Sequence, residues 1–234
     1  MKLSLPAISI RSCLLPMVAA LILPVPASYA DTIILTANLI GANEVPPTGS
    51  PGTGSATVTL DTTLDAMRVQ VSFSGLFPTI QSGPMTGAQS GVTVAHIHCC
   101  LASPLLTGVN VPVATTSPSF PDFPSGPGVT AGTYNRLFDL TLDTTYNLPN
   151  VPPGNMTPNP FLGTSAATAE PVFIKALMAG ETYLNIHSTA FSGGEIRGFL
   201  VVVPGPIAGA GLPGLILACG VLLALARRRR QLVV

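Results

Sequence analysis

The three histidines of this 234-residue chain lie in two short segments, Ala95–His98 and Tyr183–His187. His96 and His98 occupy alternate positions, which on a β-strand place two side chains on the same face, about 6.6–6.8 Å apart. His187, from a neighbouring strand, would complete a set of three imidazoles around one point. Such a set with an open position suits a single copper or zinc ion. A mononuclear metal site at these three residues is therefore one hypothesis.

The same spacing also fits a structural cluster without a metal. Buried imidazole nitrogens normally find hydrogen-bond partners, and Asn185 together with a glutamate would provide them. In the metal interpretation, Glu44 or Glu195 is expected to orient a histidine ring. The sequence leaves both interpretations open.

Glu44, Glu195 and Arg197 form a second polar set. We expect Arg197 to pair with one of the two carboxylates across the strands that open and close the domain, because a partly buried guanidinium needs such a partner. Two carboxylates also suit glycoside hydrolysis, but the chain has no Trp and only four Tyr to bind a sugar. Serine-hydrolase, phosphate-loop and zinc-protease motifs are absent from the sequence, so a non-catalytic protein is favoured over a secreted hydrolase.

The four cysteines do not permit a disulfide framework. Cys13 and Cys219 lie in the apolar segments near the two ends, which leaves the neighbours Cys99 and Cys100. These two can close a vicinal disulfide or stay reduced, and the sequence does not choose between the two states.

The elements that must position these residues are predominantly β-strands. Alternating or β-branched runs separated by Gly, Pro, Ser and Asn predict an antiparallel β-sandwich or barrel-like domain. The expected strands are Thr32–Leu39, Gly54–Leu60, Ala66–Phe73, Val92–His98, Arg136–Leu142, Tyr183–His187 and Glu195–Val203.

One helix is expected, over Ala166–Ala179, with Pro171 in its first turn and Gly180 ending it. The intervals 79–91, 101–133 and 147–164 are rich in Pro, Gly, Ser and Thr and are expected to be loops.

Both ends of the chain have the composition of targeting segments. Residues 1–30 predict a secretory signal peptide, cleaved after Ala30. Ile207–Ala226 is an uncharged stretch of 20 residues, long enough for a transmembrane helix, and Arg227–Arg230 would keep the end in the cytoplasm. The expected organisation is a signal peptide, a folded domain over 31–203 and a C-terminal segment over 204–234.

The exported domain is acidic. All ten acidic residues but only four basic ones lie between Asp31 and Val203, a formal charge of −6. An acidic domain with one lysine is unsuited to nucleic acid, so no nucleic-acid partner is expected.

Four pieces of this domain, taken in order, resemble the CHRD domain, a module named from chordin that also occurs in exported bacterial proteins. They are Leu39–Pro47, Ala95–His98, Tyr183–Ser188 and Gly194–Gly198. The resemblance implies an all-β fold and no generally assigned activity.

The tail resembles a PEP-CTERM sorting signal in a variant form. Val203-Pro204-Gly205-Pro206 precedes the apolar stretch and the arginines, without the Pro-Glu-Pro tripeptide. This resemblance implies export across the inner membrane, processing by an exosortase-like enzyme, and a binding or structural role at the cell surface or in an exopolysaccharide matrix. A permanent anchor through the C-terminal helix is the alternative, and a metal-binding or redox protein is the first rival function.

Overall fold

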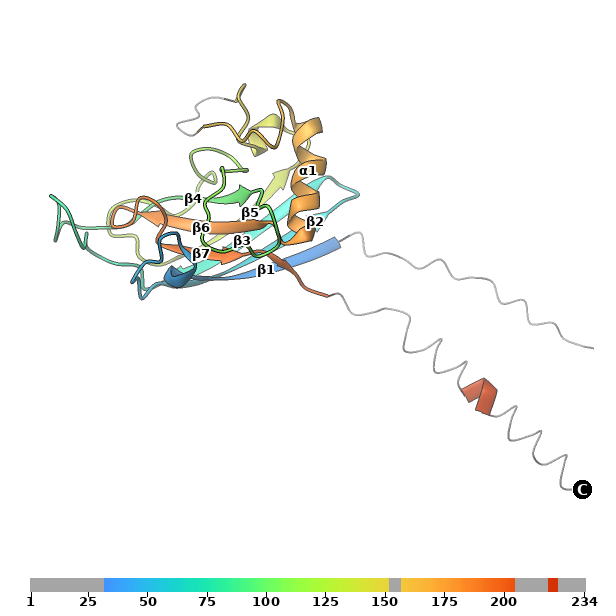
Figure 1. The fold of residues 1–234 in the computed structure, drawn as a ribbon, viewed down its shortest axis with the longest axis horizontal. Coiled ribbons are helices and arrows are strands. Elements are labelled where there is room, and N and C mark those ends of the chain that lie inside the picture. The colour runs from blue at the N-terminus through green and yellow to red at the C-terminus, as the bar shows by residue number, and fades with distance from the viewer. Residues whose placement is uncertain (1–31, 152–156, 205–218, 223–234) are drawn as a thin grey trace, which may run out of the picture.

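The computed structural model describes residues 32–151, 157–204 and 219–222. Its main element is one curled antiparallel sheet in which the strands follow the order β4-β6-β7-β1-β2-β3-β5, with β8 also paired to β1 (Figure 1). The strands are β1 (Thr32–Ile40), β2 (Thr53–Asp61), β3 (Ala66–Ser74), β4 (Val92–Cys99), β5 (Gly132–Asp139), β6 (Thr182–Ser188), β7 (Ile196–Phe199) and β8 (Val201–Val202). The helices are η1 (Gly41–Asn43), η2 (Asp143–Thr145) and α1 (Ala166–Ala179).

The structure confirms a mostly β, antiparallel domain with few short helices. Of the two predicted forms, sandwich or barrel-like, the strands form a half-barrel and not two packed sheets. β1 pairs with β2 along its whole length and meets β7 and β8 on its other side. This shared strand makes the sheet continuous, so no break divides it into the two layers of a sandwich.

Two strand predictions were wrong in their bounds. β5 spans Gly132–Asp139 instead of Arg136–Leu142, so its first two residues lie in the predicted loop 101–133. It ends at Asp139 because the Asp139 carboxylate accepts hydrogen bonds from the backbone and hydroxyl of Thr141 and turns the chain. The predicted strand Glu195–Val203 is divided in two at Leu200, whose N–H donates to Thr182 on β6 before the chain moves to β1.

α1 has its predicted bounds and begins after Ser165, which is its N-cap. It ends at Gly180, which adopts the left-handed conformation with φ of 73°. Pro171 lies at the sixth helical position instead of the first turn, so its missing N–H removes one intrahelical hydrogen bond. Phe173 and Leu177 are fully buried and fix the helix to the domain core.

The two halves of the sheet differ in what covers them. In β1, β2 and β3 buried apolar residues alternate with exposed or half-buried ones, as expected for a sheet with one solvated face. Every residue of β6 is buried, so this end of the sheet is covered on both faces. The apolar face belongs to the main core. The opposite face carries His96, Asn185 and Arg197, and we call it the covered face.

Among the described residues, no helix is long and apolar enough to cross a bilayer. The predicted transmembrane stretch 207–226 lies outside the described residues apart from one helical turn at 219–222. The predicted signal peptide with its cleavage site after Ala30, and the arginines 227–230, also lie outside them.

Candidate metal centre

Strand register brings the polar residues of the covered face into rows. His96 on β4 lies opposite Asn185 on β6, which lies opposite Arg197 on β7. His98 lies opposite Tyr183, and His187 opposite Val94. Because side chains alternate along each strand, these polar residues share the covered face while their apolar neighbours enter the core.

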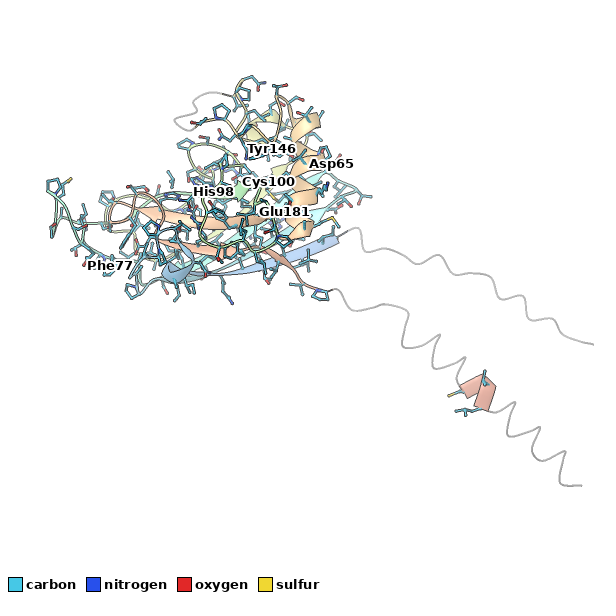
Figure 2. The ribbon with its side chains drawn as sticks, in the orientation of Figure 1. Asp65, Phe77, His98, Cys100, Tyr146 and Glu181 are labelled. Atoms are coloured by element: carbon cyan, nitrogen blue, oxygen red, sulfur yellow. A yellow bond between two sulfur atoms is a disulfide. The ribbon has the colours of Figure 1, made fainter. Side chains whose placement is uncertain are left out.

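The three imidazoles converge in this buried region. His96 is fully buried and His98 and His187 are each 7% exposed. Nε2 of His187 lies 3.1 Å from Nε2 of His96, and the candidate ligand atoms of all three residues lie within 4.8 Å of one another. The structure therefore brings together the three histidines that the sequence selected (His98 is labelled in Figure 2).

The other ring nitrogen of each histidine is held by a backbone carbonyl. Nδ1 of His96 contacts Pro118 O at 3.0 Å, and Nδ1 of His98 contacts Val111 O at 2.6 Å. Nδ1 of His187 contacts Ser192 O at 2.8 Å. A carbonyl only accepts, so each Nδ1 must carry the hydrogen, and the neutral ring then presents a free lone pair on Nε2.

These carbonyls, and not Glu44 or Glu195, orient the rings. The expectation that one of these glutamates would do so was wrong. The sequence carries no signal for the carbonyls, since every residue has one and two of the three lie in the predicted loop 101–133.

Burial keeps the imidazoles neutral. Desolvation is the largest cause of the lowered pKa at each histidine, and it lowers the pKa of His98 to about 3. The charges of His98 and His187 lower the pKa of His96 further. Neutral imidazole is the form that binds metal ions, so the cluster is ready to bind one at pH 7.

Arg197 and Glu44 form a buried ion pair beside the histidines. Nε and Nη2 of Arg197 lie 3.0 and 2.8 Å from Oε2 of Glu44, and both side chains are 1% exposed. The guanidinium also donates to Val109 O and Asn110 Oδ1 and lies 3.9 Å from the centre of the Tyr183 ring. Burial raises the pKa of Glu44, and the opposing effect of Arg197 only partly compensates.

Glu195 lies apart from this pair, although the sequence placed it in the same set. Its Oε1 accepts hydrogen bonds from the Ser50 hydroxyl at 2.6 Å and the Phe77 N–H at 2.7 Å. Glu195 therefore ties the segment before β2 to the segment after β3, while Arg197 pairs with Glu44.

Gly194 allows Glu44 to approach the sheet. Its φ is +125°, and a Cβ built on it would lie 2.6 Å from Cδ of Glu44. We expect Gly194→Ala to lower the free energy of unfolding by at least about 2 kcal/mol, through backbone strain and displacement of this carboxylate. Gly193→Ala is the matched control, because no atom lies within 4 Å of its Cβ position. Equal denaturant midpoints for the two variants would contradict this account.

Cys99 and Cys100 are joined by a vicinal disulfide directly after His98 (Cys100 is labelled in Figure 2). Cys99 is fully buried and belongs to the apolar core, on the opposite face of β4 from His98. The disulfide therefore lies next to the histidine cluster in sequence but does not enter it.

The fold and site define a mostly β domain with a buried histidine cluster on one face of a curled antiparallel sheet. A family model described as the CHRD domain matches residues 35–200. The chain therefore belongs to the CHRD domain family, and this membership suggests an extracellular structural or binding domain. No curated protein and no solved structure matches the chain.

Proposed function

We propose that this protein is an exported, non-catalytic CHRD domain protein that binds one copper or zinc ion through His96, His98 and His187. The observation that carries the proposal is the arrangement of the six ring nitrogens. Each Nδ1 donates to a backbone carbonyl, and the three Nε2 atoms converge. Metal-binding histidines in proteins commonly have their second nitrogen held in this way, and imidazole suits both metals.

A purely structural network explains this arrangement less well. Such a network places a donor against each acceptor, whereas Nε2 of His187 and Nε2 of His96 face each other at 3.1 Å with both hydrogens on Nδ1. A cation between the rings removes this repulsion between lone pairs.

We expect the purified full-length protein to contain, or to take up, one copper or zinc ion per chain. Elemental analysis measures the bound metal, and calorimetric titration of chelator-treated protein measures uptake. The chain has only three histidines, so His96→Ala, His98→Ala and His187→Ala variants test the complete imidazole set. Each variant is expected to bind the ion at least about 100-fold more weakly.

The comparison of stability with and without chelator separates the two interpretations. A metal site predicts that chelation erases most of the difference in Tm between the wild type and each variant, because bound metal stabilises only the intact site. A structural cluster predicts the same difference in both conditions. Absence of titratable copper and zinc in the wild type would refute the proposal.

The hydrolase alternative gains no support from the geometry. Glu44 and Glu195 are 2% and 0% exposed, Glu44 is bound to Arg197, and Glu195 is bound to Ser50 and Phe77. Carboxylates that hydrolyse a glycosidic bond must instead flank a cleft open to a sugar chain.

For the cellular context we propose export by the signal peptide 1–30 and sorting by an exosortase-like enzyme acting on 204–234. The mature domain would then reside at the cell surface or in the exopolysaccharide matrix. The sequence of the two ends supports this route, as does the extracellular character that the family suggests. Mass spectrometry of the mature chain after cell fractionation tests it: loss of both ends supports sorting, a retained tail supports a permanent anchor, and an intact cytosolic precursor contradicts export.

A further inference from the structure

We infer that Oδ1 of Asn185 is the fourth ligand of the metal ion and closes its coordination. The inference rests on the proposed metal site and goes beyond it, because the histidine set alone would leave one position open. Asn185 is 1% exposed and lies on β6 directly opposite His96.

Three separations in this group are those of ligands around one tetrahedral ion, and the ligand atoms of the three histidines all lie within 4.8 Å of one another. At metal–ligand distances of about 2.0–2.1 Å, two ligand atoms of a tetrahedron lie about 3.3 Å apart. Oδ1 of Asn185 lies 3.1 Å from Nε2 of His98 and 3.2 Å from Nε2 of His187. These separations match the 3.1 Å between Nε2 of His187 and Nε2 of His96, so the amide oxygen is placed to share one ion with these imidazoles.

The histidines do not supply a hydrogen to this oxygen. Their hydrogens are on Nδ1, bonded to Pro118, Val111 and Ser192. Three nitrogen lone pairs and one oxygen therefore meet in a buried place, and a cation satisfies all four at once.

The neighbouring ion pair determines which end of the amide faces the histidines. The Asn185 side chain lowers the pKa of Glu44, which is the effect of an NH₂ group turned towards the carboxylate and not of an amide oxygen. Arg197 fixes that carboxylate through Nε and Nη2. If the amide were reversed, its oxygen would face the carboxylate, so the Arg197–Glu44 pair holds Oδ1 towards the metal position.

Four protein ligands in a buried place make a structural centre. Catalytic zinc sites keep a position for water or substrate, whereas structural sites are filled by protein atoms. The expected role of the ion is therefore to join β4 and β6 and to stabilise the domain.

The test compares Asn185→Leu with Asn185→Asp in the full-length protein, with Co²⁺ as the spectroscopic probe and Zn²⁺ for affinity. Asn185→Leu removes the oxygen at similar size and is expected to weaken Zn²⁺ binding about 100-fold and to change the Co²⁺ visible spectrum. Asn185→Asp keeps an oxygen ligand and is expected to retain both affinity and the four-coordinate spectrum. Azide, a small competing ligand, is expected to leave the wild-type Co²⁺ spectrum unchanged and to alter that of Asn185→Leu.

Asn147→Leu is the matched control, because Asn147 is a buried amide whose hydrogen bonds go to Val113 O and Thr157 O and not to the histidines. It reports the general cost of losing a buried amide and is expected to leave Zn²⁺ affinity unchanged. Equal Zn²⁺ affinity and equal Co²⁺ spectra in wild type and Asn185→Leu would overturn the inference while leaving the metal site intact. A response of the wild-type spectrum to azide would also overturn it, and failure of the wild type to bind metal would overturn the proposed function as well.

Discussion

Replacing Arg197 with methionine is expected to lower the free energy of unfolding by about 3–5 kcal/mol, because the Glu44 carboxylate then remains buried without its cationic partner. The change also removes donors from Val109 O and Asn110 Oδ1 and the cation over the Tyr183 ring. Urea unfolding of Arg197→Met and wild type at pH 7 measures the difference.

Two further variants show whether the lower free energy of unfolding comes from the unpaired charge of Glu44. The double variant Glu44→Leu/Arg197→Met removes both charges and is expected to recover a large part of the lost stability. Arg68→Met, which removes an exposed arginine hydrogen-bonded to Asn135, is expected to change the free energy by less than about 0.5 kcal/mol. A double variant no more stable than Arg197→Met would show that the charge of Glu44 is not the cause.

Acidification is expected to destabilise the chelator-treated protein steeply below pH 6.5. The pKa of every histidine is lowered in the folded state, to about 3 for His98. Below pH 6.5 the histidines of the unfolded chain therefore take up protons while those of the folded chain stay neutral. The contribution of the neutral histidines to the free energy of unfolding is therefore complete above pH 6.5 and decreases as the pH falls below it. Each neutral histidine contributes a slope of about 1.4 kcal/mol per pH unit, so the three together contribute up to about 4 kcal/mol per unit.

The His98→Asn variant isolates one of these contributions. Asparagine does not titrate, so the slope of unfolding free energy against pH is expected to be shallower by about 1.4 kcal/mol per unit between pH 6 and 4. The raised pKa of Glu44 acts with the opposite sign, since the folded state then keeps this proton more readily, but it is present in both proteins. Identical slopes in the two proteins would contradict the burial of a neutral His98.

Much of the fold followed from side-chain alternation. Met67, Val69, Val71 and Phe73 alternate with polar residues and predicted β3 closely, and the helical spacing after Ser165 predicted α1. Alternation does not say which strands pair, however, so it did not reveal that β1 joins both halves into one sheet. The end of β5 was missed because Thr141 and Leu142 have strand-forming side chains, while the Asp139 carboxylate turns the backbone.

Only the parts of the site that are made of side chains could be predicted from the sequence. The scarcity and alternate spacing of His96 and His98 selected the histidine cluster. The Pro118, Val111 and Ser192 carbonyls that fix the ring tautomers leave no trace in residue type. Glu44 and Glu195 are both glutamates, so residue type does not say which of them pairs with Arg197. The three-dimensional structure pairs Glu44 with Arg197 and bonds Glu195 to Ser50.

The row formed by His96, Asn185 and Arg197 has a consequence for how reliably the chain assembles. Slipping β6 by a single residue would turn Ile186 out of the core and Asn185 into it, breaking the row and exposing apolar surface in the same step. An ion bound between β4 and β6 would stabilise only the native register. Metal binding would therefore favour the correct pairing of two strands that are separated by more than eighty residues of chain.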